Sequence, residues 1–99
     1  MNNQDKQELE SIVFKKLLSH LDSHKEVQNI DLMILAKFCR NCLSKWYSEA
    51  AQEKDLDIDL DAAKQIIYGM PYSEWKEKYQ PKATEEQLRL YSALQSSDD

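Results

Sequence analysis

Two cysteines three residues apart form the motif in this sequence that could do chemistry. Cys39 and Cys42 enclose the string CRNC, and on a helix this spacing places both sulfurs on neighbouring strips of one face. Two thiolates can supply half of a tetrahedral zinc site, whose other ligands must come from elsewhere. The chain has two histidines, His20 and His24, and His20 lies beside the apolar face expected for the first helix. Cys39, Cys42 and His20 are therefore candidate zinc ligands.

The same cysteines have a simpler interpretation as packing residues. On the expected helix Cys39 lies on the midline of an apolar stripe and Cys42 lies beside Phe38, so both can serve as small buried hydrophobes. A redox motif of the thioredoxin type needs a surrounding βαβ pattern, which is absent, and an interior helix position lacks the helix N-terminus that lowers a thiol pKa. The zinc-deaminase pattern also fails, because residue 22 is aspartate and Phe38 stands where proline is required. The sequence favours packing over zinc binding and places a redox role last.

Aromatic side chains gather around a turn at residues 68–72. They could line a pocket for a small ligand, or they could pack into the core and hold the turn against it. Arg40 could donate to an anionic ligand there, although it lies off the apolar stripe, where side chains are usually solvated. The candidate pocket residues are Tyr68, Tyr72, Trp75 and Arg40.

Familiar enzyme motifs are missing from the sequence. There is no Ser-His-Asp order, no glycine-rich phosphate loop and no His-Glu-x-x-His string. With two histidines and one glycine, most catalytic layouts lack their residues. The alternating aspartates of residues 55–61 do not form a calcium loop, because Leu60 and Ile66 stand where glycine and glutamate are needed. We therefore expect a protein that is not an enzyme and has no cofactor. The alternative is a metal-binding protein or a small metalloenzyme that holds zinc through Cys39, Cys42 and His20.

The elements that position these residues are all expected to be helices. One glycine and two prolines leave few turns, and apolar residues recur at helical spacing. Asp59 or Asp57 is expected to cap the start of one helix and Gly69 to end it, and Thr84 to Gln87 is expected to form a capping box for the last helix. The fold class is thus all-α, a compact irregular bundle of four to five helices with one long central helix. The helices are expected at about residues 5–22, 31–53, 60–68, 73–79 and 84 onward. We expect a single domain over residues 1–99, with 1–4 and 96–99 frayed.

The central helix, expected over residues 31–53, has more apolar surface than a small bundle can cover. Its core stripe is Leu32, Leu35, Ala36, Cys39, Leu43, Trp46 and Ala50. A second apolar strip contains Ile34 and Phe38, with Met33 on the flank. We therefore expect a protein-interaction module that forms a homodimer through Ile34, Phe38 and Met33. The apolar arc of the first helix is also wide enough for two contact surfaces.

Charge and hydropathy exclude several classes of partner. The formal net charge is −5, which disfavours binding to nucleic acids and to anionic membranes. No stretch approaches the ~18 apolar residues of a membrane span. The opening MNNQDKQELE has no apolar run, so we expect no signal peptide and a cytoplasmic location, where cysteines stay reduced.

Two strings are specific enough to suggest a family. Residues 27–47 (VQNIDLMILAKFCRNCLSKWY) and 68–80 (YGMPYSEWKEKYQ) resemble the short bacterial family known as domain of unknown function 1244, over roughly residues 9–91. The resemblance implies a bacterial source, a compact helical fold and a cytoplasmic protein, and it implies no activity. The family pattern is matched at Asn29, Asp31, Cys39, Cys42, Trp46, Tyr47, Gly69, Pro71 and Trp75. His20 also fits the pattern and His24 does not, so any metal would need a carboxylate or water besides the cysteines and His20.

Overall fold

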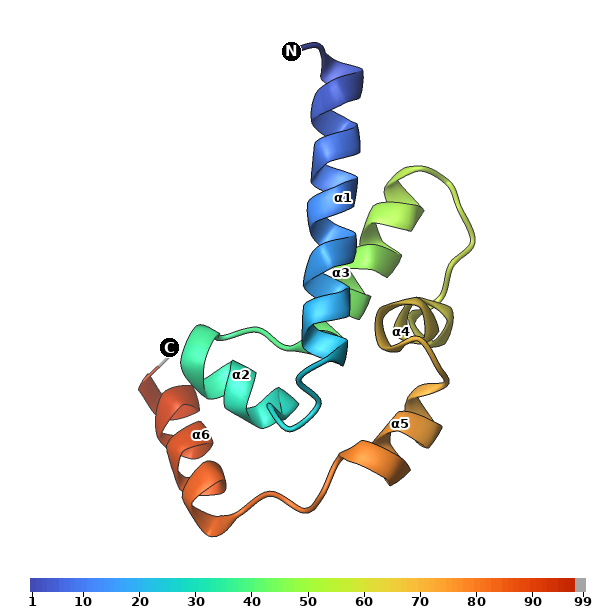
Figure 1. The fold of residues 1–99 in the computed structure, drawn as a ribbon. Coiled ribbons are helices and arrows are strands. Elements are labelled where there is room, and N and C mark those ends of the chain that lie inside the picture. Colours follow the sequence, from blue (N-terminus) through green and yellow to red (C-terminus); the bar gives the residue numbers. More distant parts are fainter. Residues whose placement is uncertain (98–99) are drawn as a thin grey trace.

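The protein forms helices throughout the part that the structure, a computed structural model, describes: the backbone of residues 1–97 and the side chains of residues 1–94. Those residues contain six helices and no strand (Figure 1). The helices are α1 (Asn3–Asp22), α2 (Asn29–Ala36), α3 (Arg40–Glu53), α4 (Leu60–Tyr68), α5 (Tyr72–Tyr79) and α6 (Glu85–Ser97). The all-α class is confirmed. Of the residues expected to fray, Asn3 and Gln4 form the start of α1 and Ser96 and Ser97 form the end of α6, while residues 98–99 lie outside the described residues.

The prediction of one long central helix over residues 31–53 is wrong. Helix α2 ends at Ala36, and Lys37 takes the left-handed conformation with φ 60° while its N–H donates to the Met33 carbonyl. Cys39 is extended and is the N-cap of α3. Hydrophobic periodicity continues on both sides of this break, so the pattern itself carries no mark of the interruption. The expected count of four to five helices becomes six for this reason.

The break changes which residues of the expected stripe are buried. Leu32, Cys39 and Leu43 lie in the core, but Leu35 is 83% exposed and Trp46 is 53% exposed. A single helix would have kept these side chains on one face. Two helices with different axes do not share that face, so α2 keeps Leu32 in the core while its other side packs against α6 (Figure 1).

The core lies where α3, α4 and α5 meet the last turns of α1. Helices α3 and α4 pack against each other, and α5 follows α4 through a short turn (Figure 1). Trp75 of α5 and Ser44 of α3 are fully enclosed. The buried cluster comprises Leu21, Leu32, Cys39, Leu43, Ile67, Tyr68 and Trp75.

The helix ends expected from the sequence are confirmed in the second half of the chain. The Asp59 carboxylate accepts from the Ala62 N–H at 2.8 Å, and Gly69 ends α4 with φ 75°. Thr84 and Gln87 form the reciprocal capping box, with bonds of 2.8 and 3.1 Å between side chain and backbone. Local chemistry decided these ends, because each cap involves residues no more than four positions apart.

Helix α1 projects from the rest of the molecule. Its N-terminal half extends past the other helices (Figure 1), and residues 1–13 are all exposed. Only its later turns meet the core, through Phe14, Leu17, Leu18 and Leu21. The radius of gyration is accordingly 15.4 Å, above the ~13 Å of a typical domain of this length. Within the described residues, no helix is both long and apolar enough to cross a membrane.

Candidate functional site

Arg40, the first residue of α3, joins three segments of the chain and is only 3% exposed. Its Nη1 donates to the Val27 carbonyl at 2.8 Å and to Asn29 Oδ1 at 3.2 Å. Its Nη2 donates to the carbonyls of Leu21 and His24 at 3.1 and 3.2 Å. The expectation of a solvated Arg40 is therefore wrong.

The surroundings of the Arg40 guanidinium explain how a cation is tolerated inside the protein. The C-terminal end of a helix has unpaired carbonyls and partial negative charge, and Leu21 lies at that end of α1. The guanidinium also lies over the Trp75 ring, 5.1 Å from its centroid, a favourable cation–π geometry. Burial nevertheless lowers the pKa of Arg40 from its usual value, since desolvation disfavours the charged form.

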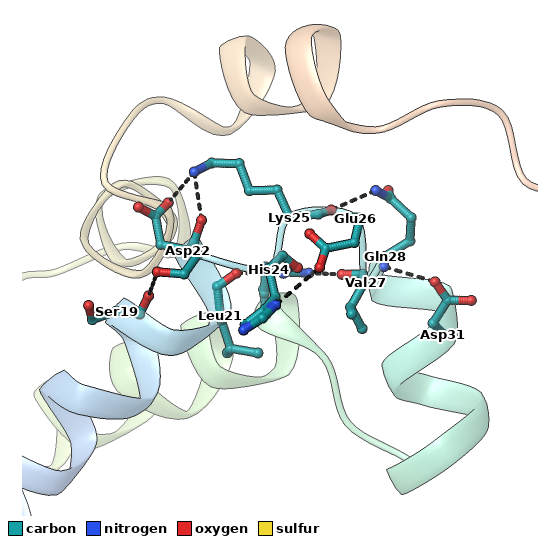
Figure 2. A network of polar contacts seen from close by, with 11 residues as sticks. Ser19, Leu21, Asp22, His24, Lys25, Glu26, Val27, Gln28 and Asp31 are labelled. Atoms are coloured by element: carbon teal, nitrogen blue, oxygen red, sulfur yellow. Dashed lines mark hydrogen bonds and ion pairs between the residues drawn. The ribbon is translucent and has the colours of Figure 1, made fainter.

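The connection between α1 and α2 is built to present those carbonyls (Figure 2). Lys25 Nζ binds both the backbone carbonyl and the carboxylate of Asp22, at 2.8 and 2.9 Å. Gln28 Nε2 donates to the Lys25 carbonyl at 2.8 Å, and the Gln28 N–H donates to Asp31 Oδ2 at 2.9 Å. These contacts close the loop on itself (Figure 2). The Leu21 and His24 carbonyls each accept a backbone N–H within the connection and use a second lone pair to accept from Arg40.

Tyr68 completes the polar interior through two asparagines. Asn29 Nδ2 donates to the Tyr68 hydroxyl at 3.0 Å, and the hydroxyl donates to Asn41 Oδ1 at 2.6 Å. Burial raises the pKa of Tyr68 well above its usual range, so the phenol stays protonated and remains a donor. Tyr68, Arg40 and Trp75, three of the four candidate pocket residues, thus surround a cavity of only about 10 Å³, at the lower limit for a single water.

Tyr72, the fourth candidate, borders a different and larger space. A cleft of about 690 Å³ lies between α2, α5 and the segment leading to α6. Gln28 forms part of its wall, and its Oε1 is buried and lacks a hydrogen-bond partner. Sequence patterns could not indicate this cleft, because its lining comes from two segments, residues 25–41 and residues 72–87, that are far apart in the chain.

The two cysteines lie at the start of α3 rather than inside a helix. Cys39 is buried at the N-cap and Cys42 is half-buried in the first turn. Their sulfurs are 4.0 Å apart, and Cys42 Sγ is also 4.0 Å from Met33 Sδ. Burial raises the pKa of the Cys39 thiol, although the backbone N–H groups of Asn41 and Cys42 act in the opposite direction.

The structure does not gather a third ligand for zinc around the cysteines. His20 is exposed in the last turn of α1, with its ring centroid 4.6 Å from that of His24. Across the described residues, no three His, Cys, Asp or Glu side chains are grouped so that they could hold a metal ion. Zinc binding at Cys39, Cys42 and His20 stays a prediction without geometric support in one copy of the chain.

The residues expected to form an interface are partly covered. Met33 and Phe38 pack against the core cluster, and Ile34 is half-buried. The Phe38 ring stacks on Trp46, with ring centroids 6.4 Å apart. More apolar surface is exposed elsewhere, on α1.

The exposed apolar surface of α1 consists of Leu9, Ile12 and Val13, which are 51, 60 and 65% exposed. Leu9 and Val13 also line a shallow apolar groove with Phe14 and Leu17. The wide apolar arc of the first helix indicated two contact surfaces, and in one copy of the chain only one of them is in use. We call Leu9, Ile12 and Val13 the α1 stripe.

Comparison with known proteins identifies the family. Residues 27–93 match the family described as protein of unknown function, DUF1244. The matched range runs from the end of the α1–α2 connection into α6, and includes Arg40, both cysteines and the Tyr68 network. No curated protein matches the chain. Because the match covers more than half of the sequence, the chain belongs to the DUF1244 family, as the resemblance in its two strings indicated.

Proposed function

We propose that this protein is an interaction module that forms a homodimer through the α1 stripe. The observation that carries the proposal is the exposure of Leu9, Ile12 and Val13 on a helix that projects from the core (Figure 1). Three neighbouring large apolar side chains that are each more than half exposed are characteristic of a surface that another molecule covers.

The length of the projecting segment supports the same conclusion. Isolated helices shorter than ~12–15 residues are marginal in water, and most helices in proteins depend on tertiary packing of an apolar face. Residues 3–13 of α1 have no such packing within one copy. A partner on the α1 stripe would supply it.

Charge favours a second copy of the chain, running antiparallel, as that partner. The acidic residues Glu8 and Glu10 flank Leu9 at the N-terminal end of the stripe, and the basic residues Lys15 and Lys16 follow its C-terminal end. An antiparallel pair with its two-fold axis near Val13 places the acidic part of each helix beside the basic part of the other. A parallel pair would instead bring like charges together.

A charge placed on the stripe tests the interface. We expect wild-type protein to sediment as a dimer, and Val13→Asp to weaken association by tenfold or more, about 1.4 kcal/mol, because the carboxylate would be desolvated in the interface. Ser11→Asp is the matched control, since Ser11 is exposed on the opposite side of α1 and its variant should remain dimeric. Sedimentation velocity over a concentration series measures both.

Two results would refute the proposed dimer. One is a wild-type protein that stays monomeric at the highest concentration reached. The other is a dimer that Val13→Asp leaves intact but that a charge at Ile34 disrupts, which would return the interface to the α2 residues expected from the sequence.

A further inference from the structure

We infer that Cys39 and Cys42 form a thiol–disulfide exchange site that takes small disulfides as substrates and alternates between two thiols and one intrachain disulfide. The inference is independent of the proposed dimer. It begins with the distance of 4.0 Å between the two sulfurs, both of which are free thiols. A disulfide bond is about 2.05 Å long, so the sulfurs must approach by roughly 2 Å.

The position of the pair at the start of α3 allows that approach. Inside a helix, residues three apart have Cβ atoms ~5–6 Å from each other, whereas a disulfide requires ~3.5–4.5 Å. Cys39 is not held in helical dihedrals, because it is the N-cap, with φ −150° and ψ −176°. An N-cap side chain turns back toward the third residue of its helix, and that residue is Cys42.

The position of the pair also removes one of the two arguments against redox chemistry in the sequence, namely that the motif lies in a helix interior. With the helix broken at Lys37, the motif has the helix N-terminus that an uninterrupted helix would have denied it. Burial raises the pKa of the Cys39 thiol, but the backbone N–H groups of Asn41 and Cys42 interact with its sulfur and act in the opposite direction, so they stabilise the thiolate when it forms. The Arg40 guanidinium interacts favourably with the same thiolate.

The two cysteines differ in burial, and this difference assigns them different roles in the exchange reaction. Cys42 is the more exposed, and Cys39 lies in the core cluster. Cys42 is therefore the sulfur that an external disulfide meets first, and Cys39 is the resolving thiol. Cys42 is itself half-buried beside Met33, which favours a low-molecular-weight disulfide over a folded protein as substrate.

The reaction balances without any further oxidant. The Cys42 thiol gives up its proton to water, and its thiolate attacks one sulfur of the external disulfide. The external S–S bond breaks, a mixed disulfide forms on Cys42, and the first external thiolate leaves and takes up a proton. Cys39 then loses its proton, attacks Cys42 Sγ and expels the second external thiolate, which is protonated in turn. Two protein thiols are oxidised, and one disulfide is reduced to two thiols.

The order of attack predicts different products in the two single-cysteine variants. The full chain is incubated with glutathione disulfide, quenched with acid, alkylated and analysed by mass spectrometry. Wild-type protein is expected to lose two hydrogens and to retain no glutathione. Cys39→Ser is expected to accumulate the mixed disulfide at Cys42, while Cys42→Ser should react at least tenfold more slowly, because only the buried sulfur remains.

A comparison of folded with unfolded protein shows whether the structure favours the disulfide. Titration with mixtures of reduced and oxidised glutathione should give an equilibrium constant for the intrachain disulfide at least roughly tenfold larger in folded protein than in urea. Circular dichroism monitors the fold of each variant, and the wild-type titration decides the matter if either variant fails to fold.

The inference is overturned if metal-free, folded wild-type protein remains a dithiol in excess glutathione disulfide. It is also overturned if folding gives no increase in the equilibrium constant, or if Cys42→Ser reacts as fast as Cys39→Ser. Protein that binds zinc through the pair and resists oxidation after chelation supports the zinc hypothesis instead.

Discussion

Arg40 shows how one residue can organise the interior of a small helical protein. Its guanidinium binds four acceptor oxygens, and three of them are main-chain carbonyls from the end of α1 and the α1–α2 connection. Within the described part of the chain no carboxylate hydrogen-bonds the cation; peptide and amide dipoles surround it, and the carboxylates of Asp22 and Glu26 act on it from further away. A planar group with five N–H donors in a fixed fork suits this arrangement, and a lysine ammonium does not.

We expect Arg40→Met to lower the free energy of unfolding by about 3 kcal/mol or more, because buried carbonyls would lose their donors. The free energy of unfolding of Arg40→Lys should lie between those of Arg40→Met and wild type, since an ammonium can reach only some of the four acceptors. Urea denaturation followed by circular dichroism measures both. A loss below about 1 kcal/mol for Arg40→Met would show that water replaces the guanidinium at little cost.

At the scale of elements, the break between α2 and α3 is the feature that arranges the site. It places Arg40 at the first position of α3, where its side chain reaches the end of α1, and Cys39 at the N-cap. It also frees α2 to pack against α6. In a continuous helix over residues 31–53, Arg40 would lie on the solvated side and Cys39 would not be an N-cap.

The end of α4 offers a direct test of backbone control. Gly69 has φ 75°, and a Cβ atom added there would meet nothing within 4 Å. Gly69→Ala should therefore cost about 1–2 kcal/mol through the left-handed conformation alone. Gly69→Asn is the matched control and should cost less, because asparagine tolerates this conformation better. Thermal and urea unfolding of the two variants check the order, and equal losses would contradict it.

At the scale of the whole molecule, the projecting α1 accounts for the extended dimensions of 48 × 31 × 26 Å. The core itself is small, and α1 contributes to it through only its later turns. A protein arranged in this way gains stability when a second molecule covers the free part of α1.

The unfolding temperature should therefore depend on protein concentration. A dimer that unfolds to monomers is stabilised by mass action, so we expect the midpoint to rise across a hundredfold concentration range. Val13→Asp should remove the dependence while Ser11→Asp keeps it. Differential scanning fluorimetry at several concentrations measures this, and a midpoint that is constant for wild type would be inconsistent with a dimer.

Local sequence chemistry was sufficient for most of the elements. The caps at Asp59, Gly69 and Thr84 and the helices of the second half follow from residues that are near neighbours in the chain. The break at Lys37 could not be predicted in this way, because lysine has no preference for the left-handed conformation and the apolar pattern does not change there. The error moved Leu35 and Trp46 from the expected core to the surface.

The sequence by itself determined the all-α class, the helix ends with local caps and the family, and it marked the pair of cysteines as the candidate chemical motif. The tertiary structure alone decided that Arg40 is buried, that the cysteines stand at a helix N-terminus, and that three neighbouring apolar side chains of α1 are exposed. The physical reason is the sequence separation between the residues that interact. A helix and its caps depend on residues up to four positions apart, whereas Arg40 binds carbonyls 13 to 19 positions away, and such partners are chosen only when the whole chain packs.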